Sequence, residues 1–245
     1  MAIKLTIDEG NSSTKAALWR GDTIEAEVMC APGNYDKIAE FVGLYSPIDV
    51  AIFCSVCRSN TDEVKSLLER YARRVIILDS NTPLPITLGY RTPSTLGADR
   101  IAAAVGAATV YPGHTCLVVD MGTAITYDVV SADGKFIGGN IAPGIFVRLE
   151  ALEHYTKALP LVETDGDCPQ WGYNTETAMR SGAIRGVVGE LQYYRQCLSS
   201  DTTPKVLLTG GSADLITPYI TFPITIEQNL VRIGLNSIIN HNENK

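Results

Sequence analysis

Apolar and polar residues alternate in two similar segments that lie about half a chain length apart. In the first segment, alternation over residues 3–8 gives way to a polar stretch and resumes over residues 14–19. The second segment, residues 116–130, has the same layout. Strict alternation is typical of a strand with one buried face. Each segment is therefore predicted to form a strand, a polar loop and a second strand.

Strand and helix patterns alternate through the rest of the chain. Short apolar runs predict strands, and apolar positions at 3.6-residue spacing predict helices. In the first such helix, Leu67, Leu68 and Tyr71 are expected on the buried face. The strands are expected near residues 50–54, 75–78 and 205–209, and the helices at about residues 62–73, 96–110 and 174–197.

The repeated layout indicates an internal duplication. Each half opens with a strand, an Asp-x-Gly loop and a second strand. The predicted halves are residues 1–113 and 114–245. Strands that alternate with helices form mixed or parallel sheets covered by helices. The expected class is therefore α/β, with a cleft between two matched halves.

Composition and charge place the chain among globular proteins. Hydrophobic residues make up 45% of the 245 residues and charged residues 19%, which is enough to form a core without disulfides. The formal net charge is −7 and basic residues form no run, so nucleic acid is not an expected partner. The uncharged stretch at residues 101–111 is well short of the roughly 20 residues that span a membrane. Without an apolar signal region before Asp8, the chain is expected in the cytoplasm, away from membranes.

The six cysteines are expected to be free thiols in that reducing compartment. Cys54 and Cys57 form a C-x-x-C pair that could hold a metal or form a redox couple. No second pair completes a zinc site, however, and the flanking residues resemble a buried strand that enters a turn. A structural role is the favoured interpretation.

The loop after the first predicted strand suits a phosphate chain with its metal. It combines a carboxylate, a glycine that permits close backbone approach, small polar side chains and a cation. Because Asp8 and a phosphate repel each other at contact, Asp8 is expected to act through Mg2+ or its water shell, and Lys15 could contact phosphate. The alternative is a plain β-hairpin with a polar turn. The loop reads Asp8-Glu9-Gly10-Asn11-Ser12-Ser13-Thr14-Lys15.

Three further loops are rich in glycine. Residues 120–124 repeat the Asp-x-Gly turn, which favours two phosphate-facing loops over a chance hairpin. Gly210 and Gly211 would let a flat ring lie against the backbone, unless they form an ordinary strand-to-helix turn. The loop at residues 138–144 either approaches a ligand or bends the chain.

Asp99 and Arg100 stand side by side at the start of an otherwise uncharged helix. In one interpretation, Asp99 only complements the helix dipole, worth under roughly 1 kcal/mol, and Arg100 extends into solvent. In the other, Arg100 pairs with a substrate carboxylate and Asp99 accepts a hydroxyl proton. The helix N-terminus is expected to lower the pKa of Asp99. An ionised Asp99 suits a phosphoryl transfer that needs its nucleophile aimed.

These motifs together resemble those of the type III pantothenate kinases, in the same order and across nearly the whole chain. That family belongs to the acetate and sugar kinase, Hsc70 and actin superfamily. The resemblance therefore implies actin-like, ribonuclease H-like halves. The matching positions are Asp8, Gly10 and Asn11; Tyr90, Pro93 and residues 96–100; Asp120, Gly122, Thr123, Ala124 and Thr126; Gly138, Gly139, Ile141, Pro143 and Gly144; and Asn174 with Thr175.

The resemblance implies ATP-dependent phosphorylation of pantothenate, the first step of coenzyme A synthesis. It also implies a homodimer that uses Mg2+ and a monovalent cation, K+ or NH4+. Two positions depart from the family pattern: Ser12 replaces the usual threonine but keeps the hydroxyl, and Glu9 adds a charge that bears on Mg2+ and phosphate affinity. Carried over by position, the proton acceptor is Asp99 and the ligand of the monovalent cation is Asp120. The residues implied to bind ATP are Asp8, Gly10, Asn11, Ser12, Ser13, Thr14, Lys15 and Thr123. Those implied to hold pantothenate are Tyr90, Gly97, Ala98, Asp99, Arg100 and Thr175.

Glycines in the predicted helix at residues 174–197 agree with a dimer. Gly182, Gly186 and Gly189 recur near one face, and each costs roughly 1 kcal/mol relative to alanine. Close approach of a second copy of the helix would offset that cost and bring Thr175 near a shared pocket. Alternatively, the helix packs only on its own sheet.

Two other functions are compatible with these motifs. A kinase of the same superfamily could act on acetate or a sugar, although an arginine beside the proton acceptor favours an acidic substrate. A nucleotide-dependent switch could keep the cleft without the chemistry. Asp99, Arg100 and Tyr90 argue against a switch, which needs no small-molecule pocket.

Overall fold

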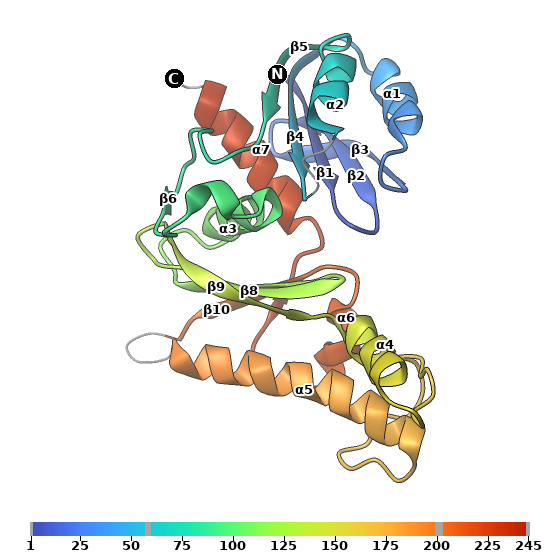
Figure 1. The fold of residues 1–245 in the computed structure, drawn as a ribbon. Helices are drawn as coiled ribbons and strands as arrows, with labels where there is room; N and C mark the ends of the chain where they lie inside the picture. Colours follow the sequence, from blue (N-terminus) through green and yellow to red (C-terminus); the bar gives the residue numbers. More distant parts are fainter. Residues whose placement is uncertain (1, 57–59, 199–202, 244–245) are drawn as a thin grey trace. The chain divides into compact units, whose positions relative to one another are not determined.

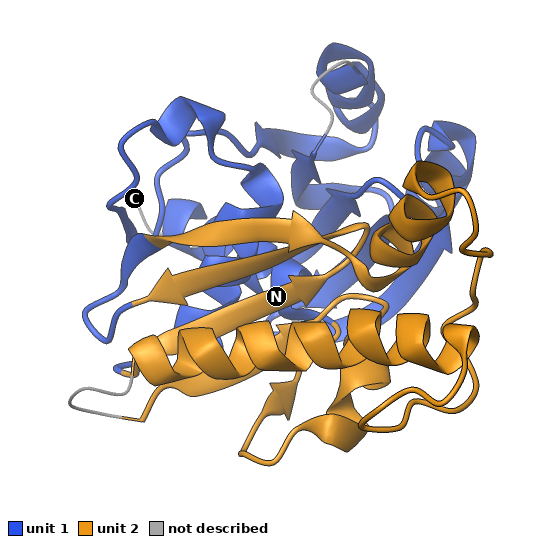
Figure 2. Cartoon of the chain, turned by 60° about the horizontal axis from the view of Figure 1, so that its bottom comes forward, with its two compact units in different colours: residues 1–113, 131–137, 229–245 blue, residues 114–130, 138–228 orange. Residues whose placement is uncertain are grey.

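The chain divides into two compact units in a computed structural model that describes residues 2–56, 60–198 and 203–243. Unit 1 contains residues 1–113, 131–137 and 229–245, and unit 2 contains residues 114–130 and 138–228 (Figure 2). The C-terminal segment, which the sequence assigned to the second half, thus packs with unit 1. That residues 1–113 and 114–245 are two halves that arose by internal duplication remains a proposal.

Unit 1 is built on a five-stranded sheet in the order β3-β2-β1-β4-β5 (Figure 1). The central strand β1 pairs antiparallel with β2 and parallel with β4. The predicted hairpin at residues 3–19 is therefore confirmed. The strands are β1 (Ile3–Glu9), β2 (Thr14–Arg20), β3 (Thr23–Cys30), β4 (Ile48–Ser55) and β5 (Ala72–Ile77).

One face of this sheet packs against α1 (Tyr35–Gly43) and α2 (Thr61–Leu68) around a buried apolar cluster. The helix predicted for residues 62–73 was too long, because the chain turns after Leu68 and enters β5. Residues 72–77 pair with β4 in parallel register, so sheet pairing prevails over the local helical pattern. Leu68 is fully buried as expected, whereas Leu67 and Tyr71 are half-buried.

Two helices of unit 1, α3 (Ala98–Val110) and α7 (Leu230–Glu243), pack closely against each other. A Cβ at Gly234 would collide with the Ala102 carbonyl, and one at Gly106 would collide with the Leu230 carbonyl. Glycine at both positions therefore allows the two backbones to touch. The short strand β6 (Thr87–Leu88) pairs in parallel with Lys135 and Phe136.

Unit 2 repeats the strand arrangement of unit 1. Its central strand β7 pairs antiparallel with β8 and parallel with β10, and β11 pairs with β10. Strands β9 and β6 follow β8 in the sheet order, and β9 runs from unit 1 into unit 2. The strands are β7 (Cys116–Met121), β8 (Ala124–Val130), β9 (Lys135–Pro143), β10 (Lys205–Thr209) and β11 (Thr225–Ile226).

Helices α4 (Ile145–Tyr155) and α5 (Thr175–Cys197) share one apolar cluster with β7, β8 and β10. A short helix, α6 (Ala213–Ile216), contributes two buried residues to it. Helix α5 is the longest helix drawn in Figure 1. In both units a central strand thus lies between an antiparallel hairpin partner and a parallel strand, which supports the predicted duplication.

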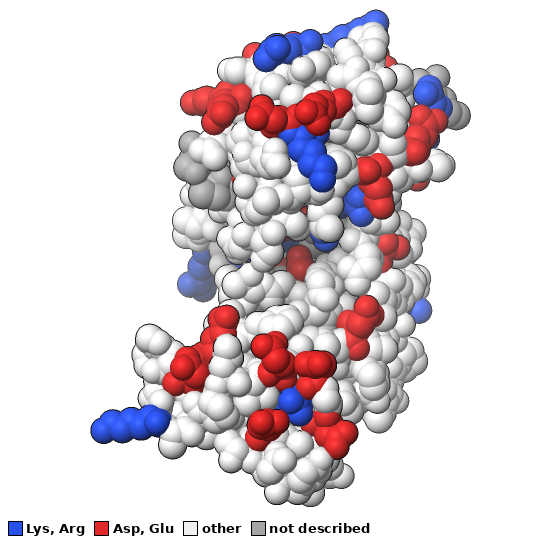
Figure 3. All heavy atoms as spheres, turned by 90° about the vertical axis from the view of Figure 1, so that its right-hand side faces the viewer, with Lys and Arg blue, Asp and Glu red and all other residues white. Residues whose placement is uncertain are grey.

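The surface carries charges of both signs. On the face drawn in Figure 3, acidic side chains are scattered, and the basic side chains of the described residues do not gather into one broad area. Among the helices in the described ranges, none combines the length and apolar character needed to cross a bilayer.

Candidate active site

The predicted phosphate loop is the turn between β1 and β2 in unit 1. Asp8, near the end of β1, lies opposite Lys15 of β2, and the Gly10 N–H donates to the Ser13 carbonyl at 2.9 Å. Asn11 and Ser12, at the tip, are exposed, whereas Asp8, Ser13 and Lys15 are half-buried. The tip thus offers an amide and a hydroxyl, with a carboxylate and an ammonium group behind them.

Thr14 and Glu9 face the interior instead. The Thr14 hydroxyl is buried and has no hydrogen-bond partner among the described residues. Both carboxylate oxygens of Glu9 accept a hydrogen bond from Tyr35 Oη, at 3.1 and 2.8 Å. Burial and the neighbouring Glu9 raise the pKa of Tyr35 to about 12, so it remains a donor. Since successive side chains of a strand point to opposite faces, the Glu9 charge is directed toward α1 and away from Asp8.

Asp99 lies in the first turn of α3, behind an N-cap glycine. A Cβ at Gly97 would collide with the Asp99 carboxylate, so glycine leaves room for that group. Burial raises the pKa of Asp99, although the backbone N–H and the charge of Arg100 oppose the rise. The backbone N–H groups of the helix N-terminus lower this pKa as expected, but desolvation is the larger effect and the net shift is upward. A carboxylate with a raised pKa is the better proton acceptor.

The charges of Asp8 and Asp99 both act on the same buried thiol. Cys54 on β4 lies beside Asp8 in the parallel register and is fully buried. Burial raises the pKa of this thiol well above its usual value, and the charges of Asp8 and Asp99 raise it further. Asp8 thus lies beside Cys54 near the end of β4, and the charge of Asp99 also reaches this thiol. Cys57, the second member of the C-x-x-C pair, lies outside the described residues.

Arg100 packs against two aromatic rings. Its guanidinium lies 5.8 Å from the centre of the Tyr90 ring and 5.7 Å from that of Phe136. The two rings meet edge to face at 6.1 Å. Arg100 is only 7% exposed, so the alternative in which it extends into solvent is wrong. Phe136 was not predicted, because only the pairing of β6 with the start of β9 brings it to Tyr90.

The predicted loops of unit 2 meet at the end of β7. Gly210 has a positive φ of 87°, and a Cβ there would lie 2.6 Å from Asp120 Oδ1 and from the Met121 nitrogen. A Cβ at Gly144 would collide with the Gly122 and Thr123 carbonyls. Backbone therefore packs directly against Asp120 and Thr123, and all three glycine-rich loops form one cluster.

Thr175 lies at the start of α5 in unit 2. It is exposed at the first turn of α5, after Asn174, whose side chain caps the helix through Thr177. The capping box fixes where α5 begins and leaves the Thr175 side chain exposed.

Comparison with known proteins identifies the family. A family model described as type III pantothenate kinase matches residues 4–196. The chain belongs to the type III pantothenate kinase family. It is 38% identical to the type III pantothenate kinase of Porphyromonas gingivalis strain W83, over 99% of this chain and 100% of that protein.

The fold of this type III pantothenate kinase family member is also seen in distant structures. The ROK hexokinase of Thermus thermophilus superposes with a TM-score of 0.57 at 14% identity, over 99% of this chain and 100% of that one. MreB 5 of Spiroplasma citri, solved with AMPPNP, has a TM-score of 0.51 at 11% identity, over 100% and 99%. The predicted actin-like α/β class is confirmed.

Proposed function

We propose that the chain transfers the γ-phosphoryl group of ATP to the primary hydroxyl of pantothenate. The products are 4'-phosphopantothenate and ADP, and the hydroxyl proton leaves with the acceptor base. Family membership supports the reaction class. The observation that carries the proposal is that Asp99 lies in the first turn of α3, where Gly97 leaves room for its carboxylate, next to Arg100, whose guanidinium is held by two aromatic rings. We place the reaction in the cytoplasm, where ATP is available.

Asp99 is the proton acceptor in this proposal. Its raised pKa favours taking the proton of the attacking hydroxyl. Pantothenate is held by Arg100 through its carboxylate, with Tyr90, Gly97 and Ala98 nearby. Two aromatic rings fix the guanidinium, so Arg100 is ready to form a bidentate pair without losing much side-chain freedom.

ATP is bound by the loop from residues 8–15 and by Thr123. The exposed Asn11 and Ser12 and the half-buried Lys15 suit phosphate oxygens. The Gly10 N–H donates a hydrogen bond to the Ser13 carbonyl, and this bond fixes the shape of the turn. The buried Thr14 supports the loop from inside.

The residues present fit a divalent and a monovalent cation. Magnesium is usually held by one or two carboxylates together with substrate phosphates and water. Asp8 would hold it there, and the bound ion would neutralise charge on the transferring phosphoryl group. Within the described ranges, no group of three or more His, Cys, Asp or Glu side chains could hold a metal alone. In this proposal, ATP phosphates and water supply the remaining ligands of the magnesium ion. Asp120 and the backbone packed around it would hold K+ or NH4+.

The enzyme is proposed to act as a homodimer through α5. A Cβ at Gly182 or Gly189 would meet no described atom within 4 Å, so nothing inside the described chain accounts for these glycines. Trp171 is 83% exposed and Tyr173 69%, just before the exposed Thr175. An exposed aromatic patch of this kind is typical of a protein interface.

A coupled assay that measures ADP formation tests the function. With ATP, Mg2+ and K+, pantothenate should be phosphorylated, whereas acetate and glucose should not. Pantothenol, which lacks the carboxylate, should be a poor substrate because it cannot pair with Arg100. Faster turnover of acetate or glucose would indicate another kinase of the superfamily. Binding of ATP without turnover of any acceptor would favour the switch.

The same assay tests the monovalent cation. K+ and NH4+ should support faster turnover than Na+, because one carboxylate with backbone oxygens suits a large, weakly hydrated ion. Asp120→Asn should reduce the difference between K+ and Na+. Equal rates in all three salts for the unchanged enzyme would contradict the cation site.

A further inference from the structure

A chain of hydrogen bonds in unit 2 connects α5 to the turn at Thr123. The Thr123 carbonyl accepts a hydrogen bond from the Gly144 N–H at 2.9 Å. The preceding carbonyl, that of Pro143, accepts one from Arg148 Nε at 2.8 Å. Arg148 Nη1 and Nη2 then donate to the two carboxylate oxygens of Glu190, at 2.8 Å each. Arg148 therefore ties one side of the turn to α5.

The strand that leaves the turn is tied to the same carboxylate. Tyr127, four residues after Thr123 on β8, donates its Oη hydrogen to Glu190 Oε2 at 2.9 Å. Tyr127 is 1% exposed, and burial together with the Glu190 charge raises its pKa, which keeps it a donor. Glu190 is thus linked by hydrogen bonds to both neighbours of the turn: to the segment at Pro143 through Arg148, and to strand β8 through Tyr127.

Arg148 and Glu190 form a partly buried ion pair, which holds the two side chains in one arrangement. The side chains are 19% and 34% exposed, so solvent screens this pair less than a surface pair. Burial opposes ionisation of Glu190, but hydrogen bonds from Arg148 and Tyr127 hold its pKa below the usual value. A planar guanidinium can bond a carboxylate with both Nη atoms while Nε bonds a carbonyl, which a lysine cannot reproduce.

We propose that Arg148 is a positioning residue for the ATP-binding turn at Thr123. It acts through Pro143 and Gly144, and Glu190 anchors it to α5. The proposal rests on the proposed function in one respect, that Thr123 contacts ATP. Because Arg148 lies in α4 and its contacts go to Pro143 and Glu190, its loss should affect nucleotide binding and spare Tyr90, Asp99 and Arg100, the acceptor-site residues in unit 1.

Two substitutions of Arg148 separate positioning from folding. Arg148→Lys keeps a charge for Glu190 but loses the Nε bond to Pro143, and Arg148→Met loses both. The ATP dissociation constant, measured by calorimetry without pantothenate, should rise about tenfold for Lys and more for Met, as expected for charged hydrogen bonds. The KM for ATP should rise similarly. The KM for pantothenate should stay within about twofold, and thermal unfolding identifies any variant that does not fold.

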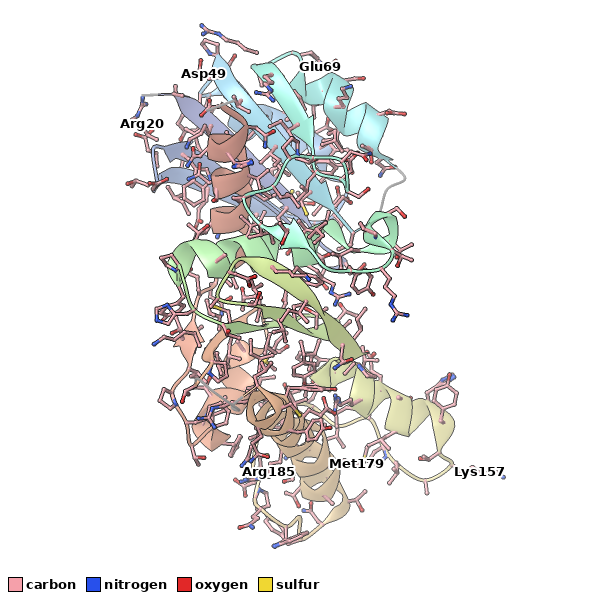
Figure 4. All side chains as sticks on the ribbon, turned by 90° about the vertical axis from the view of Figure 1, so that its left-hand side faces the viewer. Arg20, Asp49, Glu69, Lys157, Met179 and Arg185 are labelled. Atoms are coloured by element: carbon pink, nitrogen blue, oxygen red, sulfur yellow. The ribbon has the colours of Figure 1, made fainter. Side chains whose placement is uncertain are left out.

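Arg185 provides a matched control on α5, where Figure 4 labels it. It also fixes a loop through two backbone carbonyls, with Nε 2.9 Å from the Pro169 oxygen and Nη2 2.8 Å from that of Cys168. Neither carbonyl belongs to the turn at Thr123 or to the loop at residues 138–144. Arg185→Met should therefore lower thermal stability without raising the ATP dissociation constant.

The outcomes distinguish this inference from the proposed function. If the unchanged protein binds ATP but does not phosphorylate pantothenate, the function is wrong, and the calorimetric comparison still tests Arg148. If the protein is an active pantothenate kinase and a folded Arg148→Lys binds ATP as tightly as the unchanged enzyme, the inference is wrong. An equal loss of ATP affinity in Arg148→Met and Arg185→Met would likewise reduce Arg148 to a general structural role.

Discussion

At the scale of single residues, the raised pKa of Asp99 leads to a prediction for catalysis. Asp99→Asn keeps the shape of the side chain and removes the proton acceptor. Turnover should fall by roughly 10²- to 10⁴-fold, the usual contribution of a general base, and the ATP dissociation constant should change little. Stopped assays and calorimetry measure the two quantities. Near-normal turnover of the Asn variant would exclude the base role.

The pH dependence of the unchanged enzyme follows from the same group. Below its pKa, Asp99 carries a proton and cannot accept another. Since burial raises this pKa above the ordinary 3.8, kcat/KM for pantothenate should fall on the acidic side with a midpoint above that value. A pH–rate profile of the unchanged enzyme checks this. The residual activity of Asp99→Asn should lack the same limb.

Sequence could locate Asp8, Asp99 and Arg100, because each is marked by its immediate neighbours. It could not give the direction of the Asp99 pKa, since desolvation depends on the packing of the whole unit. Phe136 and Glu190 were also missed, because they reach their partners only through β6–β9 pairing and through helix packing. Residues defined by contacts between distant segments carry no local signal.

At the scale of elements, close packing of α3 on α7 predicts the effect of a single methyl group. Gly234→Ala gains up to roughly 1 kcal/mol in helix propensity. However, its Cβ would collide with the Ala102 carbonyl, and backbone cannot move aside as a side chain would. Overpacking typically costs about 1–3 kcal/mol. The melting temperature should therefore fall by several degrees, at roughly 2–4 °C per kcal/mol.

Gly43→Ala at the end of α1 is the matched control for this change. A Cβ there would lie 3.7 Å from the Tyr71 ring, which is an ordinary contact. Its melting temperature should stay the same or rise. A stabilised Gly234→Ala would show that α3 and α7 separate easily and that the two glycines are not needed for their contact.

The paired strands were easier to predict from sequence than the helix boundaries. Both hairpins follow from alternation, which is a local pattern. The helix at residues 62–73 overran into β5, because the pairing of β5 with β4 lies outside the helical window. Helix α7 was not predicted, although Val231, Leu235 and Ile239 carry helical spacing. Its place beside α3 depends on two glycines far apart in sequence, which periodicity cannot reveal.

At the scale of the whole molecule, the two units share one strand arrangement, and this much was visible in the repeated Asp-x-Gly hairpins. The site residues divide between the units, with Asp8, Asp99 and Arg100 in unit 1 and Asp120, Thr123 and Thr175 in unit 2. Thr175 is exposed at the first turn of α5, on the helix through which we propose that two copies of the chain meet. Its proposed role in holding pantothenate would then be supplied across the dimer.

The proposed dimer can be tested at a glycine that faces open space. Gly186 is a poor choice, because a Cβ there would lie 3.6 Å from Arg148 Nη1 and a larger side chain would disturb the Glu190 pair. Gly189 has no described atom within 4 Å of such a Cβ, so Gly189→Leu should leave the single chain intact. If α5 meets its symmetry mate, this variant should dissociate at assay concentrations and its KM for pantothenate should rise at least severalfold.

Light scattering after size exclusion gives the mass of the unchanged enzyme and of the variant. A monomeric mass for the active, unchanged enzyme would refute the dimer, and a dimeric Gly189→Leu with normal KM would exclude this face of α5 as its interface.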